Sequence, residues 1–261
     1  MKLIWCSDVH LNFLDKNSRQ EFYEGIKAAN GDVVVISGDI AESHNVVSMI
    51  KEMETYTNKP VYFVLGNHDF YGSNVSTVKR SVRSLGWLGG KAYVPLSCST
   101  ALLGVDGWGD CRLGNFGGSR LTMSDWLYIE DLRKGYGQGR DELKAAIQKL
   151  ADADARKLRR NVLAAIKDGY NHIVIVTHVP PFEQACLYAG RKSTEDGLPF
   201  FASKCLGDAI LPIAKKYSDI DFLWLSGHTH SRVTFHPIAN MVCKVADAQY
   251  YQPKIEEVIL I

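Results

Sequence analysis

The sequence predicts an α/β protein, and three observations support this class. An apolar run, Leu3 to Ser7, has the character of a buried strand and begins the chain. Strand-like and helix-like segments then alternate up to about residue 85, which is typical of parallel strands joined by crossover helices. Beyond residue 93, short strand-like segments follow each other without a helix, which favours hairpins in the second half.

The first half of the chain contains five predicted elements after the initial strand. Ser18-Arg19-Gln20-Glu21 has the pattern of a capping box, so a helix is expected to start there and to stop at Gly31. The β-branched run Asp32 to Ser37 predicts a strand that is buried on both faces. Helical periodicity and the residues around Pro60 predict the rest: a helix over 43–56, a strand over 61–65 and a helix over 73–85.

The second half is less regular. Short strands are expected at 93–95 and 100–105, and the glycine-rich residues 106–118 predict a loop. A helix over 123–134 is expected to be separated from a long helix over 141–167 by a glycine-rich break at 135–139. The remaining predictions are a strand over 172–177, a loop to about 199, a helix over 200–217, and strands over 221–226, 232–236, 241–245 and 255–261.

Length and composition limit the possible classes of protein. The 261 residues with 46% hydrophobic content suit one α/β enzyme domain over 1–261, with a helical, glycine-rich and basic insert at about 107–168. Basic residues exceed acidic ones by about five between Arg112 and Lys167. A solvated helix face is the favoured explanation, and a basic rim for an anionic substrate is the alternative. The net charge of +1 gives no overall attraction to nucleic acid or membrane.

The cellular setting is expected to be the cytoplasm. No signal peptide is evident after Met1, and no apolar run approaches the roughly 20 residues that span a bilayer. The six cysteines are scattered without a C-x-x-C spacing, so they are expected to be reduced thiols. The sequence leaves the oligomeric state open.

Five predicted strands end in residues that can bind a metal. In open α/β sheets, sites form beyond the carboxyl ends of the strands, so these residues can converge on one crevice. Taken singly, each of these residues could have a structural role, such as a turn or a helix cap. Chance is a poor explanation for such residues at the ends of five successive strands. The candidates are Asp8 and His10, Asp39, Asn67 and His68, His178, and His228 and His230.

The types of these residues indicate the chemistry. Carboxylates, imidazoles and one amide, without a thiolate, suit Mn²⁺, Fe²⁺ or Fe³⁺, Zn²⁺ or Co²⁺. The candidates outnumber the ligands of one ion, but two ions about 3.5–4 Å apart that share Asp39 would use them all. Such a pair of ions is suited to the hydrolysis of a phosphate ester.

The five motifs together resemble those of the calcineurin-like metallophosphoesterases, and the resemblance covers almost the whole chain. They are Asp8-x-His10, Gly38-Asp39, Gly66-Asn67-His68-Asp69, Thr177-His178 and Gly227-His228-Thr229-His230. The resemblance implies a four-layer α/β/β/α sandwich of two packed β-sheets flanked by helices. It also implies a metal-dependent phosphoric ester hydrolase in which a hydroxide that bridges two metals attacks phosphorus in line with the leaving group.

The resemblance also implies a role for each site residue. His68 would be the general acid toward the leaving oxygen and would not bind a metal. Asp39 would bridge the two ions. One metal would take Asp8, His10, Asp39 and His230, and the other would take Asp39, Asn67, His178 and His228.

The chain departs from some branches of this family. Protein Ser/Thr phosphatases carry a second aspartate after the Gly-Asp pair and end the next motif in Glu, whereas this chain continues Gly38-Asp39-Ile40-Ala41-Glu42-Ser43 and ends in Asp69. A dedicated protein phosphatase is therefore not expected. The aspartate that would orient His68 is also missing, and Glu42 or Asp69 could take that role. The small bacterial, archaeal or phage-type phosphoesterases are the closest match in pattern.

The substrate is expected to be a phosphodiester or phosphomonoester, of the nucleotide type or another small phosphoester. Aromatic residues at 108, 116, 126, 182, 188, 200 and 201 could stack on a base, although burial in the core is the commoner fate. Arg112, Arg120 and Arg191 are candidates to bind a second phosphate. A nuclease is the alternative, although the net charge does not favour nucleic acid. A non-catalytic scaffold on the same fold is less consistent with a full set of ligands, and no membrane partner is expected.

Overall fold

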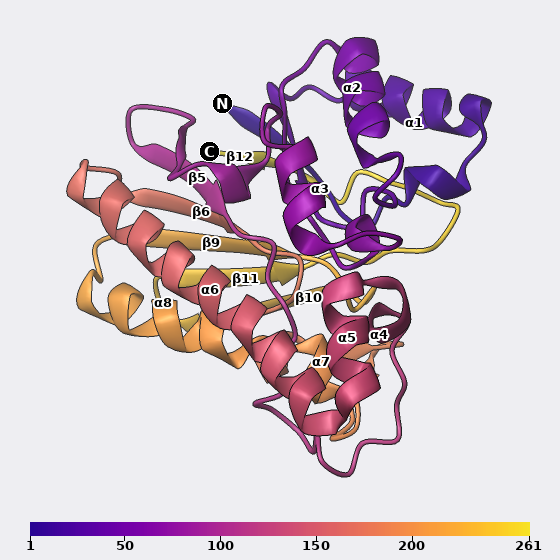
Figure 1. The fold of residues 1–261 in the computed structure, drawn as a ribbon. Coiled ribbons are helices and arrows are strands. Elements are labelled where there is room, and N and C mark those ends of the chain that lie inside the picture. Colours follow the sequence, from indigo (N-terminus) through magenta and orange to yellow (C-terminus); the bar gives the residue numbers. More distant parts are fainter.

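Two β-sheets pack face to face in the computed structural model, which describes residues 1–261 (Figure 1). The first sheet has the strand order β12–β1–β2–β3. Strands β1, β2 and β3 are parallel, and β12 is antiparallel to β1. Their bounds are β1 Lys2–Cys6, β2 Val33–Ser37, β3 Val61–Val64 and β12 Glu257–Leu260.

The second sheet has six strands in the order β10–β11–β9–β6–β5–β4. The four central strands are parallel, and the two edge strands β4 and β10 are antiparallel to their neighbours. The hairpin expected from the strands near 93–105 is the β4–β5 pair, after which β5 joins the parallel set. The bounds are β4 Val94–Pro95, β5 Thr100–Gly104, β6 His172–Val176, β9 Asp221–Ser226, β10 Val233–Ile238 and β11 Met241–Val245.

Helices cover the outer face of each sheet, which confirms the four-layer sandwich. Helices α1 (Lys16–Ala28), α2 (Val46–Thr57) and α3 (Val75–Ser81) share one core with the first sheet. Helices α6 (Arg140–Lys167) and α8 (Lys204–Lys216) share another with the second sheet. Three shorter helices lie around one end of α6 in Figure 1: α4 Asp125–Tyr128, α5 Glu130–Gln138 and α7 Leu198–Phe201. Two short strands, β7 Leu187–Tyr188 and β8 Arg191–Lys192, form a separate small hairpin.

Side chains alternate between the two faces of each strand, so one sheet packs against both the other sheet and its covering helices. Leu3 and Trp5 of β1 pack between the sheets, whereas Ile4 and Cys6 pack under the helices. Successive side chains of a strand point to opposite faces, so a continuous apolar run fills both cores. The five residues of β2 are all buried, as the β-branched run predicts.

Several predicted helix boundaries were wrong. Asp15, rather than Ser18, caps α1: its side chain accepts a hydrogen bond from the backbone N–H of Ser18 at 2.8 Å, so the helix begins before the expected capping box. The expected break at 135–139 is confined to Gly139, whose φ of 143° separates α5 from α6, while residues 135–138 continue helix α5. A Cβ on Gly135 would lie 3.0 Å from the backbone of Leu143. The helix expected over 200–217 is two helices, interrupted at Ala202 and Ser203.

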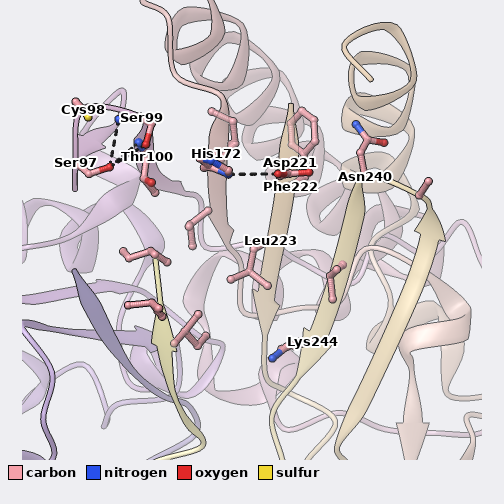
Figure 2. A pocket seen from close by; sticks show the side chains of 17 residues that line it. Ser97, Cys98, Ser99, Thr100, His172, Asp221, Phe222, Leu223, Asn240 and Lys244 are labelled. Carbon is pink, nitrogen blue, oxygen red and sulfur yellow. Dashed lines mark hydrogen bonds and ion pairs between the residues drawn. The ribbon is translucent and has the colours of Figure 1, made fainter. Parts of the chain in front are cut away.

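A cleft of about 680 Å³ opens between the sheets at the amino ends of the parallel strands (Figure 2). Thr100, His172 and Asp221, the first residues of β5, β6 and β9, lie on its wall. His172 and Asp221 form an ion pair of 3.4 Å across two of these strands. The candidate metal ligands follow the opposite, carboxyl ends of the strands, so none of them lines this cleft.

Candidate metal centre

The carboxyl ends of five parallel strands meet where the two sheets come together. Asp8, Asp39 and Asn67 follow β1, β2 and β3, while His178 and His228 follow β6 and β9. Two hydrogen bonds join the sheets at this point: the Nδ1 of His178 lies 2.9 Å from the backbone oxygen of Ser37, and the backbone N–H of His228 donates to Asp8 at 3.1 Å. The fold therefore brings together all eight residues predicted for the site.

Asp8, His10 and His230 form the first cluster. One potential ligand atom from each lies within 4.8 Å of the others. The Nε2 of His230 lies 3.2 Å from Oδ1 of Asp8, and the hydroxyl of Ser7 donates to Oδ2 of the same carboxylate at 2.5 Å. Both ring nitrogens of His10 are buried without a hydrogen-bond partner. An unpaired buried nitrogen is costly, and a metal ion would satisfy it.

Asn67, His178 and His228 form the second cluster. The amide oxygen of Asn67 lies 3.0 Å from the Nε2 of His178 and 3.1 Å from the Nδ1 of His228, and these nitrogens are 3.2 Å apart. The other ring nitrogen of each histidine faces a backbone oxygen, that of Ser37 or that of Phe200, to which it can only donate.

These backbone contacts determine which lone pairs face the cluster. When the Nε2–H of a neutral His228 donates to the backbone oxygen of Phe200, its Nδ1 carries no proton. The carbonyl oxygen of Asn67 lies beside this nitrogen. Two acceptors 3.1 Å apart need a proton or a cation between them. This orientation of histidines by hydrogen bonds from the far side of the ring is typical of metal ligands.

Asp39 lies between the two clusters. Its Oδ1 accepts a hydrogen bond from the backbone N–H of His68 at 2.9 Å, which fixes the carboxylate. Its Oδ2 lies 3.4 Å from the Nε2 of His178, 3.8 Å from the Nε2 of His10 and 4.0 Å from the Nε2 of His68. One oxygen thus faces both groups of candidate ligands.

The electrostatics of the site suit a cation. Burial raises the pKa of Asp8, but the hydrogen bond from His230 and the charge of His178 outweigh it and lower the pKa to about 2. Burial lowers the pKa of His10 and of His228 to about 4, so both are neutral and able to bind a metal. Burial also lowers the pKa of His178, but the charge of Asp39 raises it to about 10 overall. A cation on His178 would have to displace that proton.

The backbone is strained at the same residues. Asp8, His10, Asp39, His228 and His230 all adopt positive φ angles, between 40° and 71°. Residues with a Cβ rarely occupy this region, and such strain is concentrated at functional sites. The turns that follow the strands therefore hold ligand-type side chains in conformations that the chain would not adopt by preference.

Substitution of Gly227 by alanine is expected to destabilise the protein and weaken metal binding. The added Cβ would lie 2.1 Å from both the Oδ2 of Asp8 and the hydroxyl of Ser7, so the carboxylate must move. Overpacking of this kind costs about 1–3 kcal/mol of unfolding free energy, which denaturant unfolding would measure. Gly25→Ala is the matched control in helix α1, where a Cβ meets nothing within 4 Å, and it should stabilise by about 0.5–1 kcal/mol.

A cavity of about 280 Å³ opens onto the site, and three of its residues were missed by the sequence reasoning: Tyr71, Asp125 and Tyr250. Tyr188 and Phe201, which had been considered for base stacking, also line it. Burial raises the pKa of Asp125, and hydrogen bonds from Tyr71 and Asn67 counter part of this effect. The missed residues stand on loops and on a four-residue helix, where no periodic pattern or motif could reveal them.

The three arginines considered for a second phosphate lie outside this cavity. Arg112 pairs with Asp110 at 3.2 Å and with Asp152 at 2.8 Å. Arg120 is almost fully exposed, and Arg191 lies on the exposed strand β8. No lysine or arginine lines the cavity. Trp108, Phe116, Trp126 and Phe200 are buried in the core.

Comparisons with known proteins agree with this geometry. The sequence profile described as "Calcineurin-like phosphoesterase" matches residues 1–232. No match was found among curated protein sequences. No helix combines the length and the apolar character that a membrane crossing requires.

Several solved structures share the fold at low sequence identity. A dimetal phosphatase from Danio rerio is 13% identical with a TM-score of 0.60, over 95% of this chain and 87% of that one. A phosphopantetheinyl hydrolase from Mycobacterium tuberculosis is 13% identical with a TM-score of 0.66, over 99% and 95%. A 5′-nucleotidase from Candida albicans is 11% identical with a TM-score of 0.51, over 94% and 45%. Because the family profile covers most of the chain, this protein belongs to the calcineurin-like phosphoesterases, metal-dependent hydrolases of phosphoric esters that use a dimetal centre.

Proposed function

We propose that this protein hydrolyses phosphodiester or phosphomonoester bonds in a nucleotide-type or other small phosphoester. The observation that supports this most strongly is the cluster of Asn67, His178 and His228, whose ligand atoms lie 3.0–3.2 Å apart around one point. Asp39 connects that point to the first cluster, that of Asp8, His10 and His230, so the donor set suits two cations that share one carboxylate.

Each cation would have nitrogen and oxygen ligands. Such a set, without a thiolate, suits Mn²⁺, Fe²⁺ or Fe³⁺, and Zn²⁺. Asp39 would contribute to both ions, and its buried carboxylate would balance part of their charge. The first ion would be held by Asp8, His10, Asp39 and His230, and the second by Asp39, Asn67, His178 and His228.

The bound cations would polarise the phosphoryl group and supply an activated water for in-line attack. His68 would give a proton to the leaving oxygen. Its backbone N–H is held by Asp39, its Nε2 is 4.0 Å from Oδ2 of that carboxylate, and its ring lines the cavity. This position lets the imidazole reach an ester oxygen on the open side of the site.

The cavity supports a small and partly aromatic substrate. Its volume of about 280 Å³ is at the low end of small-molecule sites. Tyr188 and Tyr250 are 62% and 41% exposed at its wall, and Tyr188 stacks on Phe201 with the ring planes at 12°. Exposed aromatic rings can stack on a planar group such as a base. The absence of lysine and arginine from the wall favours one phosphate over a polyphosphate or a nucleic acid backbone.

We also propose that residues 1–261 form one metallophosphoesterase domain, with residues 107–168 as an insert that contributes Thr122 to Asp125 to the cavity. The basic residues of the insert are expected to form a solvated face. All six cysteines are free, which supports a reducing compartment such as the cytoplasm.

The proposed activity can be tested with a panel of esters. Metal-free protein should gain hydrolysis of p-nitrophenyl phosphate or bis-p-nitrophenyl phosphate when Mn²⁺, Fe²⁺ or Zn²⁺ is added, and a nucleotide or cyclic nucleotide should be a better substrate by kcat/KM. The protein without added metal is the control. Protein that binds two metal ions and hydrolyses no ester would contradict the proposal and favour a scaffold. Cleavage of DNA or RNA with a steep salt dependence would favour a nuclease.

A further inference from the structure

Asp125 reaches the site from the insert and contacts the motif that contains two of the proposed functional residues. Its Oδ1 accepts a hydrogen bond from the amide NH₂ of Asn67 at 2.9 Å and another from the hydroxyl of Tyr71 at 2.6 Å. Apart from Asp39, it is the only carboxylate that lines the cavity. It is the first residue of the four-residue helix α4.

The first contact determines which way Asn67 faces. A side-chain amide has an oxygen on one side and an NH₂ group of nearly the same shape on the other. Because Asp125 accepts from the NH₂ group, the oxygen of Asn67 is turned toward His178 and His228. Without the carboxylate, the amide could rotate and present N–H donors to the point where a cation would bind.

The second contact determines where the ring of His68 lies. Tyr71 stacks on His68 with ring centroids 4.4 Å apart and an interplanar angle of 30°, while the Nδ1 of His68 is buried without a partner. The two carboxylates that the sequence suggested for orienting His68, Asp69 and Glu42, do not contact its ring. Asp69 accepts backbone N–H bonds from residues 40, 41 and 66, and Glu42 faces His44 at 3.8 Å.

We propose that Asp125 and Tyr71 are a pair of positioning residues for the centre. Asp125 orients the amide of Asn67 directly, and it orients the ring of His68 through the hydroxyl of Tyr71. The inference deepens the proposed function and rests on it, because it takes Asn67 as a metal ligand and His68 as the proton donor. It also gives the insert a role, since a residue of α4 compensates for the orienting aspartate that the motif at Gly38-Asp39 lacks.

Titration of the metal-free protein with Mn²⁺ tests the contact with Asn67 without any use of activity. Asp125→Ala should lower the affinity for one of the two Mn²⁺ ions by about 10–100-fold and leave the affinity for the other unchanged, as expected for the loss of a residue that orients a ligand. Asp125→Asn should restore most of the affinity, because its amide oxygen can accept both hydrogen bonds. Asp141→Ala, an exposed acidic residue of the insert, is the matched control and should bind as the wild type does.

The rate of hydrolysis tests the contact with His68. Tyr71→Phe keeps the ring against His68 but loses the hydroxyl, which donates to Asp125 and accepts a longer bond of 3.3 Å from the amide of Asn67. Asp125 still accepts from that amide at 2.9 Å, so both Mn²⁺ ions should bind normally. Turnover of an alkyl phosphate should fall by about tenfold or more, and turnover of p-nitrophenyl phosphate should fall less, because its leaving group needs less help from an acid. Tyr128→Phe, on the outer side of Tyr71, is the control.

Two results would overturn the inference. One is an Asp125→Ala protein that unfolds like the wild type and binds both Mn²⁺ ions with unchanged affinity. The other is a Tyr71→Phe protein with wild-type rates on both esters. If the wild type hydrolyses no ester at all, the proposed function fails, but the Mn²⁺ titration still decides whether Asp125 orients Asn67.

Discussion

Asp39→Asn is expected to weaken the binding of both metal ions at once. One oxygen of Asp39 faces the histidines of both clusters, at 3.4 Å from His178 and 3.8 Å from His10. Asparagine is nearly isosteric, and its oxygen can still accept the backbone N–H of His68, so the fold should persist. The amide lacks the negative charge and turns an NH₂ group toward the imidazoles and the cations.

Loss of a residue that only orients a ligand lowers metal affinity by about 10–100-fold. Loss of the shared ligand should lower the affinity for each ion by more than this. Metal content after dialysis, with Mn²⁺ titration, is the measurement, and turnover should fall by at least a thousandfold, or about 4 kcal/mol of activation free energy. Asp154→Asn is the matched control, because Asp154 is also a buried aspartate but pairs with Lys79. Retention of two tightly bound ions in Asp39→Asn would refute the bridging role.

The strand ends could be predicted because they depend on local sequence. The β-branched runs before Asp39 and His178, and the one-residue separation of Asp8 and His10, indicate where a strand stops and which residues follow it. Parallel strands place such ends along one edge, so convergence follows from the α/β class alone. The roles of the individual ligands rest on the family resemblance and stay predictions.

The rest depends on contacts between distant segments. Tyr71 has no signal in the sequence, since its importance comes from a hydrogen bond to Asp125 on helix α4, which is distant along the chain. Tyr250 lies near the end of the chain and reaches the site by packing 4.6 Å from the ring of His10. The expected break at 135–139 was too long for a similar reason: the chain breaks at Gly139, whereas glycine at 135 serves the close packing of two helices, which the local sequence does not distinguish from a turn.

His68→Ala is expected to slow turnover by about 10²–10⁴-fold, as for the loss of a general acid, and to leave both metal ions bound. The backbone N–H of residue 68 would still donate to Asp39, so the carboxylate should keep its position. The loss should be largest for alkyl esters and smaller for p-nitrophenyl esters, whose leaving oxygen needs no proton. Steady-state rates on a series of esters with graded leaving-group pKa values would measure the difference.

Metal content separates an acid from a ligand in this experiment. One ring nitrogen of His68 lies within 4.8 Å of ligand atoms of His10 and Asp39, so the same imidazole is near enough to a cation to bind it. An acid role predicts two Mn²⁺ ions in His68→Ala and a steeper dependence on the leaving group, whereas a ligand role predicts one lost ion and an equal loss for all esters. His172→Ala, half-exposed at the opposite ends of the strands, is the control for removal of an imidazole. Because the two roles differ in both readouts, two bound ions together with an equal loss for all esters would contradict the acid role of His68.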